Sequence, residues 1–174
     1  MRIVLIGTHS VGKTTLVNAL MDDERFKETG YEIRNEVIRK CVMEHGLPIN
    51  EQGTIAAQNM FLDASIDNMK GDNFIADRGV IDVMAYTMQL NCDGKEEHLN
   101  RALRFIESNP DIVYCYIPIE AKLDCDGFRS SDETYRNNID KCIWKLARKV
   151  KNLRVVCGPT LLRVNTILEI INNF

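Results

Sequence analysis

The stretch Arg2-Ile3-Val4-Leu5-Ile6-Gly7-Thr8-His9-Ser10-Val11-Gly12-Lys13-Thr14-Thr15 decides the fold of this chain. It begins with a short apolar run rich in β-branched side chains, which predicts a buried strand. The pattern G-x-x-x-x-G-K-[ST] follows without substitution, and apolar residues then recur at helical spacing. This order of strand, loop and helix is the context that confirms a phosphate-binding loop, so the stretch predicts a nucleoside triphosphate site.

The residue types of the loop suit that chemistry. Gly7 and Gly12 allow a tight turn and a close approach of the backbone to a phosphate. Backbone N–H groups at the start of the helix attract the anion, Lys13 can reach the β- and γ-phosphates, and the Thr14 hydroxyl can ligate Mg²⁺. We therefore expect ATP and Mg²⁺ to bind this loop, which consists of Gly7, Thr8, His9, Ser10, Val11, Gly12, Lys13, Thr14 and Thr15. His9 stands at a variable position of the pattern and receives no individual role.

The bulk composition predicts one ordinary globular domain over residues 1–174. Hydrophobic residues make up 45% of the chain and charged residues 27%, and the net charge of −3 exerts no global attraction toward nucleic acid or an anionic membrane. The chain enters an expected strand at its second residue, so we expect no signal peptide, and it has no apolar run of membrane-spanning length. Its six cysteines form no metal-binding pattern, and they favour reduced thiols in a cytoplasmic protein.

Apolar runs and helical stripes alternate along the rest of the chain. This alternation predicts right-handed βαβ crossovers, and therefore a parallel sheet covered by helices on both faces, with ligands at the carboxyl ends of the strands. The segment 22–30 reads as a loop. The expected strands are 2–6, 31–34, 74–77, 112–117 and 153–157, and the expected helices include 36–44, 51–69, 80–90 and one opened by Gly158-Pro159.

A second informative stretch follows the third expected strand. Asp77 closes that strand, where a phosphate-loop enzyme places a second carboxylate for its metal ion. Arg78 can bind a polar or anionic group of a phosphoryl acceptor. Asp82 and Tyr86 lie four residues apart and so share one face of the next helix, where acceptor contact competes with helix-dipole stabilisation for Asp82 and with packing for Tyr86.

These motifs together resemble the P-loop nucleoside and nucleotide kinases. The resemblance is closest to the branch that includes the ribosylnicotinamide-kinase domain and related small AAA-type kinases, and it is looser to thymidylate and deoxynucleoside kinases. It covers most of the chain in the right order. The residues that carry it are Gly7–Thr15, Glu36 with Arg39, Gln58, Asp77-Arg78-Gly79 with Asp82 and Tyr86, and Asp126-Gly127-Phe128-Arg129.

The resemblance implies a sheet in the order 2-3-1-4-5 and a lid at about 124–136. It implies that Arg129 and Arg136 close over the transferring phosphoryl group. It also implies that Glu36 faces the acceptor, although the sequence does not decide whether Glu36 or Asp77 acts as a base. The implied sites are Lys13, Glu36, Asp77, Arg129 and Arg136 for catalysis, Glu36, Arg39, Arg78, Asp82 and Tyr86 for the acceptor, and Thr14 with Asp77 for the metal.

The sequence therefore predicts a Mg²⁺-ATP-dependent kinase that acts on a small nucleoside or nucleoside monophosphate. The late Asn-Lys-x-Asp pattern of a GTPase is missing, although the preference for ATP over GTP stays open. One alternative is a polynucleotide 5′-kinase, which the basic residues of 141–154 would serve; we favour a solvated helix face there. The other alternative is a nucleotide-binding ATPase switch. Whether the chain forms a homodimer also stays open.

Overall fold

A five-stranded parallel sheet forms the centre of the molecule. The computed structural model describes residues 1–120 and 132–173, so the predicted Arg129 lies outside the described residues. The strand order is β2-β3-β1-β4-β5, which confirms the order implied by the resemblance. The strands are β1 (Arg2–Ile6), β2 (Glu32–Arg34), β3 (Phe74–Asp77), β4 (Val113–Tyr116) and β5 (Leu153–Val155), and each adjacent pair is parallel.

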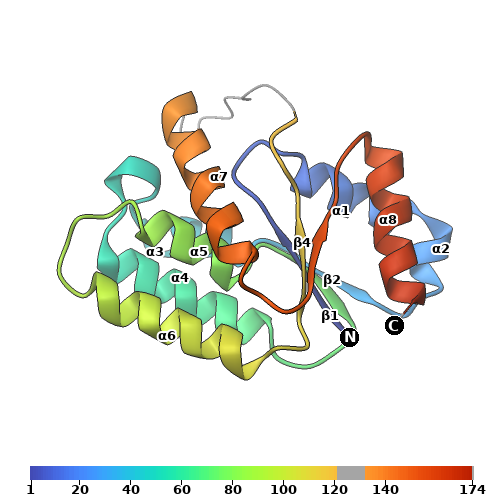
Figure 1. The fold of residues 1–174 in the computed structure, drawn as a ribbon, viewed down its shortest axis with the longest axis horizontal. Helices are drawn as coiled ribbons and strands as arrows, with labels where there is room; N and C mark the ends of the chain where they lie inside the picture. Colours follow the sequence, from blue (N-terminus) through green and yellow to red (C-terminus); the bar gives the residue numbers. More distant parts are fainter. Residues whose placement is uncertain (121–131, 174) are drawn as a thin grey trace.

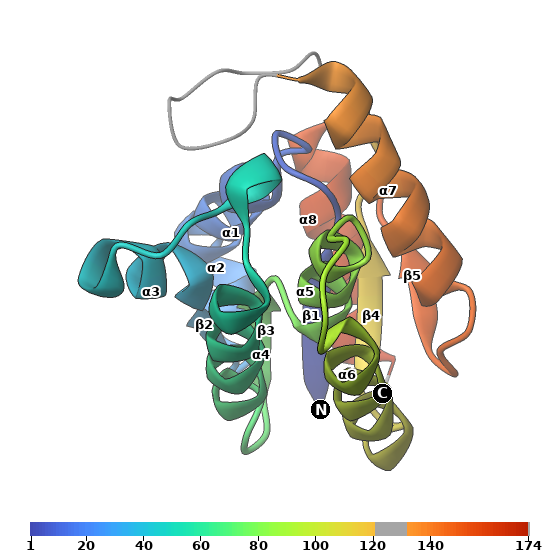
Figure 2. The same cartoon turned by 90° about the vertical axis from the view of Figure 1, so that its left-hand side faces the viewer.

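Helices cover both faces of this sheet (Figures 1 and 2). Because successive strand residues point to opposite faces, Val4 and Ile6 pack into one core while Ile3 and Leu5 pack into the other. The first core is covered by α4 (Ile55–Asn68), α5 (Val80–Thr87), α6 (Lys95–Ser108) and α7 (Glu133–Ala147). The second is covered by α1 (Lys13–Asp22), α2 (Glu24–Lys27) and α8 (Thr160–Asn172).

The edge of the sheet beside β2 carries α3 (Val37–His45), which packs Ile38, Cys41 and Val42 against the first core. A short 3-10 helix, η1 (Asn50–Gln52), follows before α4 begins. The sheet register places Leu5 opposite Asp77, so the end of β3 lies beside the start of the phosphate loop. Among the described residues, no helix is both long and apolar enough to cross a membrane.

The sequence-based boundaries were wrong at several points. Segment 22–30 contains the short helix α2, because the Asp23 side chain accepts a hydrogen bond from the Arg25 N–H and caps it. The predicted helix 51–69 is divided, and Thr54 caps the part that begins at Ile55. The helix predicted over 80–90 ends at Thr87. Pro159 is the N-cap of α8 and lies before its first turn.

Candidate active site

The phosphate loop joins β1 to α1 at the carboxyl edge of the sheet. Gly12 has a φ of 87°, a left-handed conformation that favours glycine, and a Cβ at Gly7 would lie 2.6 Å from the Ile117 carbonyl oxygen. The Lys13 ammonium donates to the carbonyl oxygens of Gly7 (2.5 Å) and Thr8 (2.7 Å), so it lies against the loop. Burial, with the nearby charge of Arg78, lowers the pKa of Lys13 to about 8. A polyphosphate on this loop would favour the charged ammonium.

The predicted metal ligands come together at the end of β3. The Thr14 hydroxyl donates to Asp77 Oδ2 at 3.3 Å, and Asp77 Oδ1 is buried without a hydrogen-bond partner among the described residues. Burial raises the pKa of Asp77, while the positive charges of Lys13 and Arg78 favour its ionised form. A hydroxyl beside a carboxylate with an unused buried oxygen suits Mg²⁺, which prefers oxygen ligands. The residues present therefore fit this ion.

Arg78 adopts a strained backbone conformation that directs its side chain. Its φ is 74°, a left-handed value uncommon for a residue with a side chain, and its N–H donates to the Leu5 carbonyl oxygen at 3.1 Å. Its Nε lies 2.7 Å from Glu36 Oε1, and both side chains are largely buried. The turn after β3 thus brings Arg78 to Glu36, which lies between β2 and α3.

Asp82 lies in the first turn of α5, which is the helix-start role that the sequence analysis set against acceptor contact. Its side chain is completely buried, and its two oxygens accept hydrogen bonds from the N–H groups of Gly7 and Gly79, each at 3.1 Å. Burial raises the pKa of this carboxyl, against the positive charges of Lys13 and Arg78. Asp82 therefore ties the phosphate loop to the start of α5, and it is not among the residues that line the cavity described next.

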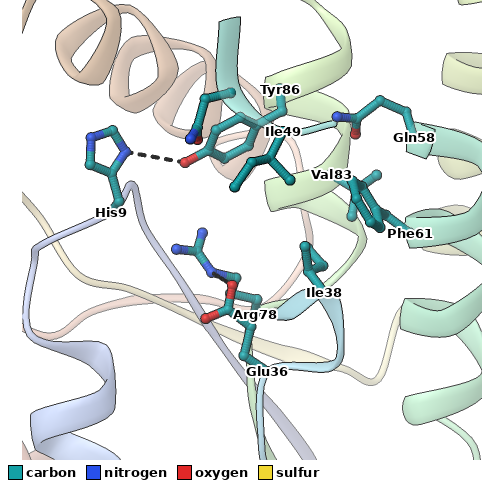
Figure 3. Close-up of a pocket in the computed structure, with 10 residues that line it drawn as sticks. His9, Glu36, Ile38, Ile49, Gln58, Phe61, Arg78, Val83 and Tyr86 are labelled. Atoms are coloured by element: carbon teal, nitrogen blue, oxygen red, sulfur yellow. Dashed lines mark hydrogen bonds and ion pairs between the residues drawn. The ribbon is translucent and has the colours of Figure 1, made fainter. Parts of the chain in front are cut away.

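A cavity beside the loop brings together residues from distant parts of the chain (Figure 3). Ile38, Ile49, Phe61 and Val83 give it apolar walls, while the Glu36–Arg78 ion pair lies at one side. His9 Nδ1 lies 3.2 Å from the Tyr86 hydroxyl, so the loop is connected to the far wall. The cavity is lined by His9, Glu36, Ile38, Ile49, Asn50, Gln58, Phe61, Arg78, Val83 and Tyr86.

Two predicted cations differ in their relation to this region. Arg136, near the start of α7, is 1% exposed; its Nε donates to the His9 carbonyl oxygen (3.1 Å) and its Nη2 to that of Ser10 (2.8 Å). A guanidinium therefore lies directly against the phosphate loop. Arg39, on α3, is exposed and is not among the residues that line the cavity.

A second cavity lies on the opposite side of the loop. Arg163 of α8 donates to the Val11 carbonyl oxygen (2.7 Å), to the Gly158 carbonyl oxygen (2.8 Å) and to Glu120 Oε2 (2.7 Å). The same Glu120 oxygen accepts from the Gly158 N–H at 2.8 Å. This cavity is lined by Val11, Gly12, Thr15, Glu120, Gly158, Pro159, Thr160 and Arg163.

Sequence reasoning gave no individual role to two residues that the structure brings into these sites. His9 was treated as a variable loop position, although its side chain reaches the first cavity. Arg163 stands in an amphipathic helix, where nothing in the local pattern distinguishes it from a solvated arginine. Spacing could not reveal either contact, because the partners of His9 and Arg163 are separated from them by 77 and 152 residues along the chain.

Comparisons with known proteins show which family the chain belongs to and which solved structures share its fold. A sequence profile of the AAA domain matches residues 2–159. A search of curated proteins finds no match. Among solved structures, the chain is similar to a NadR protein in complex with NR (TM-score 0.73, 16% identity), covering 99% of this chain and 50% of that one. The chain thus spans half the length of that NadR protein.

Two further solved structures match over at least 98% of their length. A deoxyadenosine kinase from M. mycoides has a TM-score of 0.62 and 18% identity, and 100% of each chain is covered. A thymidylate kinase from Ehrlichia chaffeensis has a TM-score of 0.63 and 12% identity, and 98% of each chain is covered. The chain has the fold of these P-loop kinases and, by the profile match over residues 2–159, belongs to the AAA domain family.

Proposed function

We propose that this protein is a Mg²⁺-ATP-dependent kinase that phosphorylates a hydroxyl group of a small nucleoside. One observation carries the proposal. The Glu36–Arg78 ion pair lines an apolar-walled cavity, and its charges act on the buried ammonium of Lys13 in the phosphate loop. The carboxylate of Glu36, which would face the acceptor, is therefore close to the ammonium of Lys13, which would hold the donor phosphates. The match to nucleoside and nucleotide kinase structures supports this reaction class.

The charges of the cavity favour a nucleoside over a nucleoside monophosphate. Arg78 is the one lysine or arginine among its described lining residues, and the nearby Glu36 balances its charge. A monophosphate would bring at least one further negative charge to a carboxylate, with no additional lysine or arginine among the described lining residues to balance it. A neutral sugar hydroxyl meets no such repulsion and can donate a hydrogen bond to Glu36.

In the proposed reaction, the loop backbone and Lys13 hold the triphosphate. Thr14 and Asp77 are the residues that would hold Mg²⁺, and this ion would supply positive charge to the phosphates. Glu36 accepts the proton of the acceptor hydroxyl. The hydroxyl oxygen forms a bond to the γ-phosphorus as the bond from that phosphorus to the β–γ bridging oxygen breaks, which releases ADP. Arg136 stabilises the charge that develops on the transferring group. The second cavity would receive the rest of the donor nucleotide.

An acceptor screen with γ-labelled ATP tests this proposal. The panel consists of nucleosides, nucleoside monophosphates and 5′-hydroxyl oligonucleotides, and the labelled product is identified in each case. We expect a labelled nucleoside monophosphate from at least one nucleoside. Label found only in nucleoside diphosphate, only in oligonucleotide or only in inorganic phosphate would overturn the nucleoside assignment, and it would indicate a monophosphate kinase, a polynucleotide kinase or an ATPase switch respectively.

A further inference from the structure

The carboxylate of Asp82 lies between the phosphate loop and the turn that carries Arg78. It is completely buried, and it is not among the described residues that line either cavity. Its Oδ1 accepts from the Gly7 N–H and its Oδ2 accepts from the Gly79 N–H, each at 3.1 Å. A backbone N–H can only donate, so the direction of both hydrogen bonds is fixed. This carboxylate has no part in the proposed reaction, although it contacts both halves of the site.

The contact with Gly7 reaches the first residue of the phosphate loop. Gly7 follows β1 directly, and its carbonyl oxygen accepts from the Lys13 ammonium at 2.5 Å. The N–H of Gly7 is therefore held by Asp82 while its carbonyl group is held by Lys13. Because a Cβ at Gly7 would lie 2.6 Å from the Ile117 carbonyl oxygen, the loop has little room to move toward the end of β4. The start of the loop thus depends on a side chain from α5.

The contact with Gly79 holds the turn that directs Arg78. Arg78 has a left-handed backbone, a conformation that persists only where the surrounding contacts hold it. The Leu5 carbonyl oxygen accepts from the N–H of Arg78 itself, and Asp82 accepts from the N–H of the next residue. Nη1 of Arg78 also lies 3.7 Å from Asp82 Oδ1. Since Arg78 Nε lies 2.7 Å from Glu36 Oε1, the place of Glu36 depends on the same turn.

We propose that Asp82 is a positioning residue that keeps the phosphate loop and the Arg78 turn at the separation that phosphoryl transfer needs. The inference rests on the proposed function, in which the loop holds the γ-phosphate and Glu36 holds the acceptor hydroxyl. A displacement of about 1 Å between reacting groups lowers a rate about 10²-fold, even where each substrate keeps its own binding contacts. Asp82 itself touches neither substrate.

Asp82→Asn tests this role directly. An amide has one oxygen, so Asn accepts from one of the two N–H groups and turns its NH₂ toward the other. With a nucleoside that the wild-type protein phosphorylates in the acceptor screen, we expect kcat to fall about 10²-fold. The Kd of that nucleoside and the Kd of ATP, measured by calorimetry, should each stay within about threefold. A nucleoside Kd raised tenfold or more with kcat retained would make Asp82 an acceptor-binding residue and overturn the inference.

Gly79→Ala displaces the same turn without changing Asp82. The φ of Gly79 is −159°, which any residue adopts, but a Cβ there would lie 2.6 Å from Val4 Cγ1. We expect this variant to lose kcat as Asp82→Asn does, with both Kd values retained. Val4→Ala removes the opposing methyl group, so the double variant should recover most of the lost kcat. Val4→Ala alone is the control, because its core cavity lowers the Tm while kcat should stay within about threefold. A kcat that follows the Tm of these proteins, and not the overlap of Gly79→Ala with Val4, would overturn the inference, also where Asp82→Asn does not fold.

Amide hydrogen exchange of the unliganded protein tests the two contacts independently of activity. Relative to the N–H of Val156, which donates to the Tyr116 carbonyl oxygen, we expect those of Gly7 and Gly79 to exchange more rapidly in Asp82→Asn than in the wild-type protein. Unchanged relative exchange at both glycines, or a kcat of Asp82→Asn within about tenfold of wild type, would each overturn the inference. If the wild-type protein phosphorylates no nucleoside, the proposed function fails instead, and the kcat comparison is made with the acceptor that the screen identifies. Label found only in inorganic phosphate would overturn both.

Discussion

The two cavities on either side of the phosphate loop are built in different ways. The proposed donor side combines the phosphate loop, a short contiguous motif that presents backbone N–H groups, with the second cavity, whose lining adds Glu120, Gly158 and Arg163 from later in the chain. The acceptor side, which is the first cavity, is formed by side chains from β1–α1, α3, α4 and α5 and from the turn after β3. Backbone binding of phosphate is general, whereas a set of side chains selects a particular ligand. We infer that the donor side supplies the reaction and the acceptor side supplies the specificity.

The largest expected effect comes from removal of the donor-side ammonium. Lys13→Ala should lower kcat/KM by about 10³-fold or more, because the transferring phosphoryl group loses its nearest loop cation. Nucleoside binding, measured by calorimetry, should stay within about twofold. Lys141→Ala, at an exposed lysine of α7, is the matched control. A parallel loss of nucleoside affinity would show that the two sides are not separable.

The next effect belongs to the acceptor side. Glu36→Gln keeps the size and the hydrogen-bonding capacity of the side chain but removes the base, so kcat should fall by about 10² to 10⁴. ATP affinity should be unchanged by equilibrium titration. Glu44→Gln, at an exposed position of α3, the helix that begins directly after Glu36, controls for changes in that helix. A loss of less than about tenfold in kcat would exclude Glu36 as the base.

Much of the donor side could be predicted from the sequence because its chemistry is local. The spacing of Gly7, Gly12, Lys13 and Thr14 predicted the loop, and the place of Asp77 at a strand end predicted its approach to Thr14, which the structure shows at 3.3 Å. The alternation of strands and helices predicted the parallel sheet. Helix ends were less predictable, because single capping contacts such as that of Thr54 decide them.

The acceptor side could be predicted only in part. Glu36 and Arg78 were both expected there, but their ion pair depends on the left-handed backbone of Arg78, which no sequence pattern indicates. For Asp82 the sequence left acceptor contact and a helix-start role open, and it did not indicate that the side chain is completely buried and accepts from two backbone N–H groups. The wall at Phe61 depends on how α4 packs on the sheet, and the wall at Ile49 comes from the segment between α3 and η1. Long-range packing, and not local pattern, therefore forms this cavity.

A moderate effect should appear when the Arg163 side chain, which joins the phosphate loop to the second cavity, is removed. Arg163→Leu eliminates the bonds to Val11, Gly158 and Glu120, and the KM for ATP should rise about tenfold, the value of one hydrogen bond to a charged group. The KM for the nucleoside should not change in the same steady-state assays. Arg154→Leu, at an exposed arginine of β5, provides the comparison. A rise in the nucleoside KM alone would contradict the assignment of the second cavity to the donor.

A smaller effect is expected on the acceptor side from loss of one hydroxyl. Tyr86→Phe removes the contact with His9 Nδ1 and should raise the nucleoside KM about fivefold, while the KM for ATP is retained. Tyr31→Phe, at a half-buried tyrosine that packs against the opposite core, is the control. If Tyr86→Phe changed only the KM for ATP, the His9–Tyr86 contact would belong to the donor side.

The smallest effect is a pH dependence of stability in the layer behind the acceptor cavity. Burial lowers the pKa of His98 in the folded protein. When the pH falls below the ordinary pKa of a histidine, the unfolded chain therefore binds a proton at this residue more readily than the folded protein does. The free energy of unfolding should therefore decrease as the pH is lowered through about 6.5, by on the order of 1.4 kcal/mol per pH unit at most. Urea titrations of His98→Gln should show a shallower decrease. An identical slope in both proteins would refute this contribution.

A crystal structure with a phosphorylatable nucleoside and a non-hydrolysable ATP analogue tests the central claim most directly. The account predicts that the nucleoside occupies the first cavity, with its reacting hydroxyl about 2.6–3.2 Å from a Glu36 oxygen and directed at the γ-phosphate on Lys13. A nucleoside bound outside this cavity, or one whose base rather than its sugar faces Glu36, would contradict it.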